Sequence, residues 1–341
     1  MLNCEPSKAK EVAAVYNHRV AHLTRGGNDE DRRLDDAARA GWLYYVAGNT
    51  QDQVAAKLGI SRQAAQRLVS LAVAAGLVKV RLEHPITQCL DLATRLQDRF
   101  ALKLVEVAPT DPASDSTTLG VAEALAVEIE RVLRSPAPIV MAMGTGRTLK
   151  AAVDLLPDID ASQHKIVSLT GTITPDGSAA FYNVIYDMAS AVRSRLFPMP
   201  LPVIASSKRE RDLLHRQPML QTTLKLAAKA NVAFVGIGDL GAAAPLFVDG
   251  FISRQELRAL QKAGGVGEIV GWAFDQRGQM VADITYDRVA SAQIPSRDAC
   301  LVIAGAKGKL KLPGIMAALR GRLINGLITD EATAQAVLGL K

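Results

Sequence analysis

Four long polar side chains, spaced as on the outer face of one helix, could form hydrogen bonds to DNA. Arg62, Gln63, Gln66 and Arg67 lie in the stretch 50–69 (TQDQVAAKLGISRQAAQRLV). Arginine and glutamine side chains can bond to the edges of bases, and arginine also binds phosphate. This chemistry needs a helix whose N-terminal end enters the major groove of the duplex.

The same stretch carries the signals that would build and orient such a helix. Thr50 and Ser61 are each placed to cap the N-terminus of a short helix, and Gly59 suits the tight turn between the two helices. The apolar faces of the two helices are formed by Val54, Ala55, Leu58, Ala65, Leu68 and Val69. The stretch therefore predicts a helix-turn-helix that binds DNA. The alternative is a two-helix packing unit with polar outer faces.

The segments on either side extend the predicted DNA-binding domain. Residues 34–47 are predicted to form a helix that packs Trp42, Leu43 and Val46 against the two helices that follow. Alternating apolar and basic residues over 78–82 predict a strand, either a wing that touches phosphate or a plain edge strand. The expected DNA contacts are Thr50, Gln51, Ser61, Arg62, Gln63, Gln66, Arg67, Lys79 and Arg81.

Composition and charge agree with a cytoplasmic protein that binds a polyanion. The chain has 341 residues, 49 % hydrophobic and 22 % charged, with a formal net charge of +6. Within residues 50–82, five basic residues stand against Asp52 alone, and such a positive patch favours DNA. Three scattered cysteines without a histidine cluster predict neither a disulfide framework nor a metal site. The same cysteine pattern suits a reducing cytoplasm, where we expect the protein to be located. No apolar run is long enough to span a membrane, so we expect no membrane partner. We also expect no cofactor.

The chain from residue 102 onward is predicted to be an α/β domain. Apolar runs typical of buried strands occupy 102–108, 138–143, 165–171, 201–206, 231–238, 300–306 and 323–329. Helix-like segments lie between them, at 117–134, 181–195, 208–228, 253–263 and 330–338. This alternation favours a doubly wound, mostly parallel sheet with helices on both faces.

One further helix is predicted between the two domains. Apolar residues recur along residues 86–100 at the spacing of an amphipathic helix. Such a helix could pair with its copy in a dimer, as a symmetric DNA-binding protein requires, or pack within the chain. The expected division is a mobile segment at 1–30, a DNA-binding domain at 31–84, a linker or dimerisation helix at 85–101, and an effector domain at 102–341.

The loop that follows the second predicted strand could hold an anion or a sugar. It reads Gly144-Thr145-Gly146-Arg147-Thr148 and leads into a helix. Its glycines let backbone N–H groups approach a ligand, and the N-terminus of the helix adds partial positive charge. Arg147 and Thr148 add side-chain donors. The loop matches neither a P-loop nor GxGxxG, and the alternative is a tight turn from strand to helix.

Other predicted strands also end in residues that suit a polyhydroxylated ligand. In open α/β sheets ligands lie outside the carboxyl ends of the strands. Hydroxyl groups need paired donors and acceptors, and phosphate needs lysine, arginine and backbone amides. The expected ligand set is Gly144, Thr145, Gly146, Arg147, Thr148, Gly171, Asn183, Gly238, Asp239, Glu268, Lys309 and Lys311. Taken singly, Asp239 could cap a helix and the lysines could be solvated.

Several motifs, in order, resemble those of the SorC/DeoR-type sugar-binding transcriptional regulators of bacteria, over nearly all of the chain after residue 30. The resemblance rests on the helix-turn-helix at 50–69, GTGRTL at 144–149, VGIGDL at 235–240, GVGEIVGWAFDQRG at 265–278, KLPGIMAALRG at 311–321 and LITDEATAQAVL at 327–338. The family pairs a small DNA-binding domain with an effector domain similar to sugar-phosphate isomerases. The resemblance implies a dimer or tetramer that binds operator DNA and a small carbohydrate or sugar phosphate.

The resemblance also assigns roles to residues. The family's ligand loop falls on Gly144, Gly146, Arg147 and Thr148, its acidic residue on Glu268, and its lysine on Lys311. Gly305-Ala306 departs from the usual Gly-Gly, which leaves Lys307 and Lys309 as competitors for the lysine's role. Arg147 stands where some members carry threonine, so both a changed phosphate contact and a non-phosphorylated ligand are compatible with the loop.

The sequence therefore predicts a transcriptional regulator, expected to be a repressor, of a carbohydrate or polyol catabolic operon. Its effector would be a sugar, a polyol or a sugar phosphate. The alternative is a sugar-phosphate isomerase-like enzyme that uses Glu268 and Lys311 as acid and base, but a shared fold does not confer activity.

Overall fold

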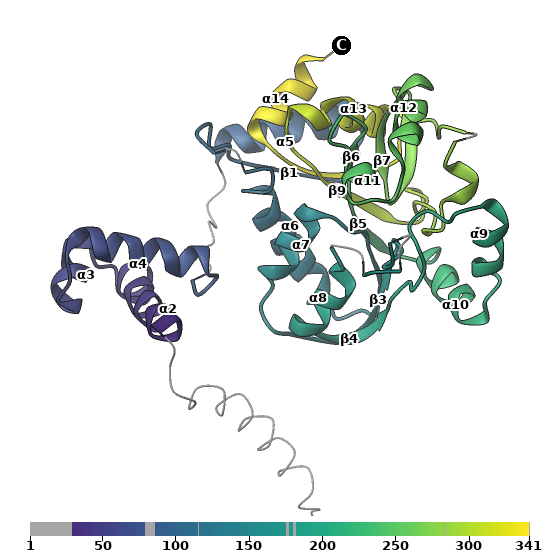
Figure 1. Ribbon diagram of the computed structural model, residues 1–341. Helices are drawn as coiled ribbons and strands as arrows, with labels where there is room; N and C mark the ends of the chain where they lie inside the picture. Colours follow the sequence, from purple (N-terminus) through teal and green to yellow (C-terminus); the bar gives the residue numbers. More distant parts are fainter. Residues whose placement is uncertain are drawn as a thin grey trace, which may run out of the picture. The chain divides into compact units, whose positions relative to one another are not determined.

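The chain divides into two units, Met1–Leu82 and Glu83–Lys341, in the computed structural model (Figure 1). The structure describes residues 29–78, 86–114, 116–174, 177–179, 182–282 and 284–340. The predicted wing, with Lys79 and Arg81, and nearly all of the predicted N-terminal segment lie outside the described residues.

Short helices build the smaller unit. They are α2 (Asp29–Gly41), a π-helical turn η1 (Trp42–Val46), α3 (Gln51–Leu58) and α4 (Arg62–Ala74). Ala40, Val54, Ala55, Ala65 and Val69 form its buried core. The predicted helix pair is confirmed, because the apolar positions of α3 and α4 face this core as expected.

The predicted packing of Trp42 and Val46 is wrong. Trp42 is 56 % exposed and Val46 is 68 % exposed, while Leu43 packs against the core. The α-helix ends at Gly41, and the chain continues as a π-helical turn. In this wider turn each residue advances by a smaller angle than in an α-helix, so positions expected on one face no longer align.

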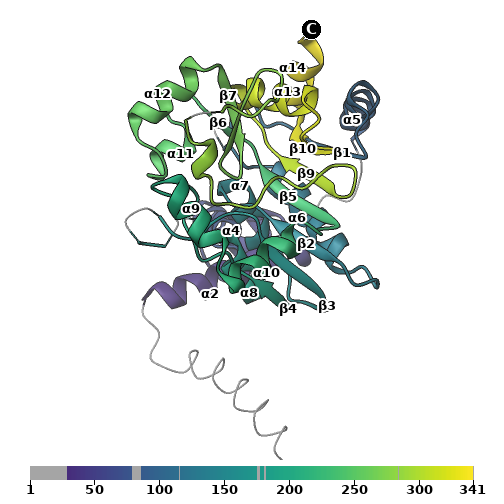
Figure 2. The same ribbon diagram turned by 90° about the vertical axis from the view of Figure 1, so that its right-hand side faces the viewer.

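A seven-stranded sheet forms the centre of the larger unit, in the order β1-β10-β9-β5-β2-β3-β4 (Figure 2). All neighbouring strands in it are parallel. The strands are β1 (Leu104–Ala108), β2 (Val140–Met143), β3 (Ile159–Ser168), β4 (Val192–Phe197), β5 (Val232–Gly236), β9 (Leu301–Gly305) and β10 (Gly326–Asp330). The doubly wound α/β fold predicted from the sequence is confirmed.

Helices cover both faces of this sheet. Met141 and Met143 of β2 pack with α6 (Val121–Leu133), α7 (Arg147–Asp154) and α8 (Val184–Ala191) on one face. Ala142, between them, packs on the other face because successive side chains of a strand alternate. The helices on that face are α5 (Thr87–Phe100), α10 (Pro218–Ala227), α13 (Leu312–Arg320) and α14 (Glu331–Gly339).

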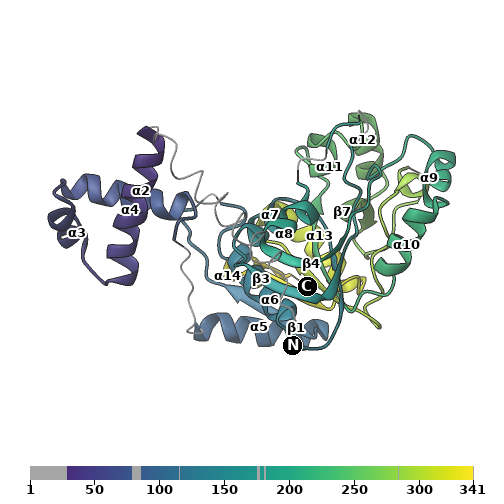
Figure 3. The same ribbon diagram turned by 90° about the horizontal axis from the view of Figure 1, so that it is seen from below.

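A second, three-stranded sheet was not predicted. Strands β6 (Gly238–Asp239), β7 (Gly265–Ile269) and β8 (Trp272–Asp275) pair antiparallel. The short helices α11 (Pro245–Val248) and α12 (Arg254–Lys262) lie beside this sheet (Figure 3). Their buried side chains form a core of their own with β8.

Three predicted elements differ in the structure. Residues 201–206 do not form a strand and make only single bridges, because alternate prolines at 198, 200 and 202 lack the N–H groups that a ladder needs. The helix predicted at 181–195 ends early, and β4 follows α8 directly. The predicted helix at 208–228 is likewise two helices, α9 (Lys208–His215) and α10, with Pro218 at the break.

The amphipathic helix predicted at 86–100 is present as α5 and packs within the larger unit. It contacts β1 and α14 and buries Cys89, Leu92 and Leu96. Ile86 and Leu90, which were expected on the apolar face, are exposed. The Arg99 guanidinium donates to the carbonyls of Val337, Leu338 and Leu340 at the end of α14. Pairing of α5 with its copy stays a prediction.

Candidate functional site

The sheet has a topological switch point between the carboxyl ends of β2 and β5, where the ligand crevice of an open α/β sheet is expected. From β2 the chain proceeds to β3 and β4 at one edge, whereas from β5 it proceeds to β9 and β10 on the other side. At such a switch point the loops that follow adjacent strands diverge, and ligands bind between them. The loop after β2 lies against β5, because a Cβ on Gly144 would lie 3.3 Å from the Phe234 carbonyl oxygen.

The loop Gly144–Thr148 supplies backbone and guanidinium donors rather than hydroxyl groups. Gly146 has a φ of +116° and caps α7, so only a glycine fits there without strain. Arg147 is exposed at the first turn of α7. Thr145 Oγ1 donates to the Tyr182 carbonyl, and Thr148 is buried. Of the loop's side chains, Arg147 is therefore the one free to reach a ligand.

Glu268 enters the crevice from the small sheet. It lies on β7 opposite Gly238 of β6, and a Cβ on Gly238 would meet Glu268 Oε1 at 2.1 Å. Gly238 therefore makes room for the carboxylate rather than binding a ligand itself. The Gly271 N–H donates to Glu268 Oε2 at 2.8 Å, which leaves the other carboxylate oxygen available.

Five charged side chains face one another at this edge. Glu268 and Asp239 of the small sheet lie close to Lys311, which precedes α13, and Arg147 lies close to both Lys311 and Asp249. Among the described residues, none of the five takes part in an ion pair of 4.0 Å or less. The five side chains therefore carry charge but form no short ion pairs with one another.

The pKa shifts of the cluster follow from burial. Burial of the Glu268 carboxyl raises its pKa, against the opposing effects of the Gly271 N–H and of Lys311. Burial, together with the nearby charge of Arg147, lowers the pKa of Lys311. Burial also raises the pKa of Asp249, against the attraction of Arg147. Each shift indicates that water is scarce around the charged atoms.

Asp249 was not predicted. It follows α11, and Gly250 after it has a φ of +77°. The Asp-Gly pair is an ordinary turn signal, and only the folding of α11 over the small sheet brings the carboxylate to the cluster.

The remaining expected ligand residues fall into two groups. Gly144, Thr145, Gly171 and Asn183 line a cavity of only about 10 Å³, which is room for about one water molecule. A Cβ on Gly171 would lie 2.3 Å from the Leu201 carbonyl oxygen, so Gly171 allows two chain segments to approach. Lys309 is exposed in a 3-10 turn, η3 (Lys309–Lys311).

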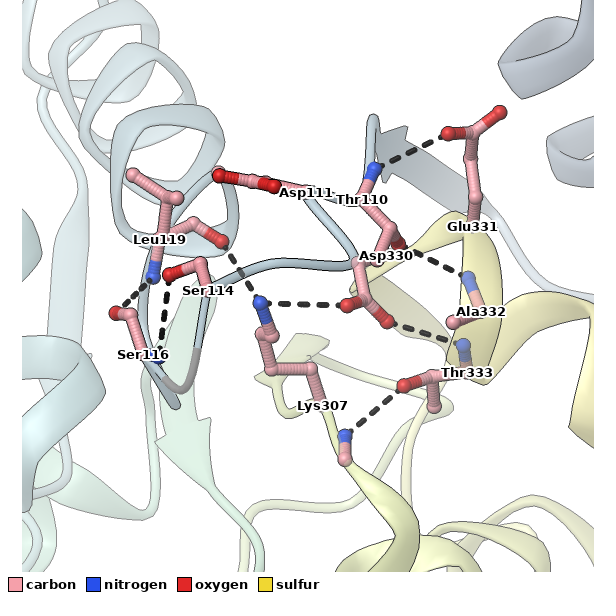
Figure 4. A network of polar contacts seen from close by, with 12 residues as sticks. Thr110, Asp111, Ser114, Ser116, Leu119, Lys307, Asp330, Glu331, Ala332 and Thr333 are labelled. Atoms are coloured by element: carbon pink, nitrogen blue, oxygen red, sulfur yellow. Dashed lines mark hydrogen bonds and ion pairs between the residues drawn. The ribbon is translucent and has the colours of Figure 1, made fainter.

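Lys307 is engaged elsewhere (Figure 4). Its ammonium lies 3.3 Å from Asp330 Oδ2 and donates to the Leu119 carbonyl. Asp330 also accepts the Thr333 N–H, and Thr333 Oγ1 accepts the Gly308 N–H. We call Lys307, Gly308, Leu119, Asp330 and Thr333 the closed network. Of the three competing lysines, Lys311 is the one that lies near the carboxylates of the crevice, Glu268 and Asp239.

A larger cavity, of about 600 Å³, lies beyond the amino ends of β9 and β10. Trp272, Arg297 and Leu323 are among its lining residues. The Arg297 guanidinium donates to the Ile324 and Ala101 carbonyls, and Trp272 Nε1 donates to the Ala292 carbonyl. The crevice at the carboxyl ends remains the better candidate, because ligands of open α/β sheets bind outside the carboxyl ends of the strands.

The smaller unit presents the expected DNA-facing residues on its surface. Ser61 accepts the Ala64 N–H, and Thr50 and Gln53 form a reciprocal cap, so both predicted caps are confirmed. Gly59 is left-handed, with a φ of +68°. Four side chains of α4 are exposed: Arg62, Gln63, Gln66 and Arg67.

The two arginines have only weak attachments to their own domain. Arg62 Nε lies 3.5 Å from Asp52, with both side chains 67 % exposed, and Arg67 Nε donates to the Gln63 carbonyl. Solvated pairs of this kind contribute little, so both guanidiniums can turn to an external partner. The Thr50 and Ser61 hydroxyls are used in capping, and Gln51 is half-buried.

Two absences hold for the described part of the chain. No group of three His, Cys, Asp or Glu side chains there could hold a metal ion. None of the helices in those same residues is both long enough and apolar enough to cross a membrane.

Comparison with known proteins agrees with both units. Residues 84–339 match the family model of a putative sugar-binding domain. The erythritol catabolism regulatory protein EryD of Brucella abortus (strain 2308) is 35 % identical over 303 residues, covering 89 % of this chain and 96 % of EryD. The transcriptional regulator LsrR of Enterobacter sp. (strain 638) is 33 % identical over 318 residues, covering 89 % of this chain and 92 % of LsrR.

A solved structure supports the fold. The full-length sorbitol operon regulator SorC from Klebsiella pneumoniae superposes with a TM-score of 0.66 at 23 % identity, covering 91 % of this chain and 100 % of SorC. These relatives are transcriptional regulators rather than enzymes. The family model and the two curated relatives confirm the resemblance seen in the sequence, and the chain belongs to the SorC/DeoR-type sugar-binding transcriptional regulators.

Proposed function

We propose that the protein binds operator DNA through the N-terminal end of α4 and that a sugar or polyol in the β2/β5 crevice controls this binding. The main support is the cluster of Arg147, Asp239, Asp249, Glu268 and Lys311, whose charges are not paired with one another at short range. Sugar hydroxyls can donate to carboxylates and accept from cations at the same time. The name of EryD, which refers to erythritol catabolism, favours a polyol operon.

Control of DNA binding requires that the effector change how two recognition helices are spaced. Helix-turn-helix proteins bind two half-sites one helical turn apart, so we propose a homodimer or a tetramer that acts as a repressor. A small rotation between subunits is then enough to weaken DNA binding. By linkage, DNA changes the affinity for the effector by the same factor.

The experiment starts from a duplex selected from a random pool by the full chain. Arg62→Ala and Arg67→Ala should each weaken binding by about 1–3 kcal/mol where the arginine reads a base, or reduce the salt dependence where it contacts phosphate. Arg95→Ala is the matched control, because Arg95 is a similarly exposed arginine on α5, paired with Asp91. Anisotropy titrations at several salt concentrations measure both effects. Unchanged affinity in both α4 variants would contradict the proposed interface.

Control by the effector is tested in the same titration. Erythritol, xylitol, sorbitol and monosaccharides, each with and without phosphate, are added to the complex with the selected duplex. We expect one of them to change the dissociation constant of the complex. The Arg147→Ala variant should lose this response and still bind the duplex. A response that survives unaltered in this variant would remove Arg147 from the site.

A further inference from the structure

The balance of charge in the crevice distinguishes a neutral polyol from a phosphate ester. Three carboxylates lie at the crevice: Asp239 and Glu268 belong to the paired strands β6 and β7, and Asp249 follows α11, which packs on β6. The two cations are Arg147 at the start of α7 and Lys311 in η3, which contacts β6. We infer that the effector is an uncharged polyhydroxylated compound and that a phosphate ester is excluded. This inference rests on the proposed function, because it concerns the ligand of the same crevice.

Both cations of the crevice already face carboxylates. Arg147 lies near Asp249, and Lys311 lies near Glu268 and Asp239. A phosphate that approached either cation would therefore meet a carboxylate as well. Like charges at short range in a partly buried site are strongly unfavourable. The two cations compensate the protein's own acids and leave no excess positive charge for a ligand.

The glycine loop offers a phosphate less than its sequence indicates. Phosphate sites combine backbone N–H groups with side-chain hydroxyls and cations. Here the Thr145 hydroxyl donates to the Tyr182 carbonyl, and Thr148 is buried in α7. Lys307 is held by Asp330 and the Leu119 carbonyl. From this loop only the backbone N–H groups and Arg147 remain as donors. They lie beside the carboxylates of Asp239, Asp249 and Glu268, which we call the acidic wall.

A neutral polyol suits the same groups. One carboxylate can accept hydrogen bonds from two neighbouring hydroxyls, and the ligand oxygens can accept from Lys311 and Arg147. Burial already raises the pKa of Asp249 and of Glu268, which means that negative charge is disfavoured there. Hydroxyl donors stabilise these carboxylates without adding charge, whereas a phosphate would add up to two negative charges.

The first test is a thermal-shift comparison on the full chain. Erythritol, xylitol and sorbitol are compared with their monophosphates and with inorganic phosphate at equal concentrations. We expect at least one neutral polyol to raise the melting temperature, since a ligand at 100 times its dissociation constant adds about 2.7 kcal/mol, and we expect no response to its phosphate. A response to the phosphate esters alone would overturn this inference and leave the proposed function standing. A chain that responds to neither class overturns both.

The second test changes the charge of the acidic wall. Asp249→Asn should shift the ratio of affinities for the phosphate ester and the neutral polyol roughly tenfold toward the ester, because a neighbouring charge shifts such equilibria by about one pKa unit or more. Asp158→Asn is the matched control, since Asp158 is exposed outside the cluster. Calorimetric titration gives the ratio. An equal ratio in both variants would contradict the charge argument.

Discussion

Two groups of opposite charges lie at the same edge of the sheet, and they differ in whether their bonds are complete. In the closed network, Lys307 pairs with Asp330 and bonds to the Leu119 carbonyl. In the crevice, Lys311 and Glu268 lie near each other without a short ion pair. Both lysines come from the short segment between β9 and α13. Position alone therefore does not tell a structural lysine from a binding lysine.

The difference lies in what each group stabilises. A satisfied buried network holds neighbouring segments in one arrangement. The closed network joins the end of β9, the start of α14 and the loop before α6. Buried charges that lack partners weaken the folded state unless a ligand completes them. We therefore expect loss of stability from changes in the closed network and loss of effector response from changes in the crevice.

The largest effect is expected from Lys307→Met. This change leaves the Asp330 carboxylate, whose side chain is only 4 % exposed, without its cation and should cost about 3–5 kcal/mol of unfolding free energy. Differential calorimetry of the larger unit's transition measures the loss. Lys309→Met is the control, because Lys309 is exposed. Adding Asp330→Asn to Lys307→Met should restore much of the loss, since asparagine can still cap α14. If Lys307→Met and Lys309→Met melted at the same temperature, the proposed difference between the closed network and the crevice would be contradicted.

A different outcome is expected from Lys311→Met. Effector binding should weaken at least tenfold, because the main cation facing Glu268 is lost. The ligand-free chain should keep its unfolding free energy within about 1 kcal/mol, because Lys311 forms no ion pair of 4.0 Å or less with any described residue and burial already disfavours its charge. Isothermal titration and calorimetry on the same sample separate the two quantities. Normal effector affinity combined with a large loss of stability would reverse the roles of the two lysines.

The smallest effect concerns pH, and it has opposite signs in the two groups. Hydrogen bonds from Thr333 and the charge of Lys307 lower the pKa of Asp330. Its contribution to stability is therefore present above the unfolded pKa near 3.8 and is lost as the pH falls through the lower folded value. The folded pKa of Glu268 is raised above 4.5. Its carboxylate therefore destabilises the fold above the folded pKa, and this cost disappears as the pH falls toward 4.5.

The melting temperatures of two variants, measured as a function of pH, test these opposite pH dependences. Glu268→Gln should be more stable than the unaltered chain at pH 7 and equal to it near pH 4.5. Asp330→Asn should be less stable at pH 7, and its difference should shrink as the pH falls below about 3.8 and vanish below the lower folded pKa. Parallel curves for both variants would show that neither carboxyl titrates as described.

Local signals predicted the parts of the molecule that depend on neighbours in the chain. Thr50, Ser61 and Gly59 adopt their predicted positions because caps and turns are decided within a few residues. The strand-end loops were also found, because parallel topology brings the carboxyl ends of strands to one edge. The family resemblance assigned the lysine to Lys311, and the structure was needed to separate it from Lys307 and Lys309, since three lysines within five residues carry the same local pattern.

Features that depend on distant packing were missed. The residues of the small sheet contain glycines and few long apolar runs, so only pairing across the fold identifies β6 and β7. Asp249 reaches the crevice through the fold of α11 and carries no motif. The edge strand β4 has charged residues at alternate positions, which suit an edge but weaken the strand signal.

The position of β1 has a consequence for how the chain is made. Its one partner within the seven-stranded sheet is β10, and the bond from the Ala332 N–H to Thr110 Oγ1 joins residues 222 positions apart. At a synthesis rate of about 5–20 residues per second, β1 waits roughly 10–40 s on the ribosome for its neighbour. The helices of the smaller unit contact one another locally and can form in that interval. A nascent chain stalled before β10 would therefore carry a folded DNA-binding unit beside an effector unit whose edge is still open.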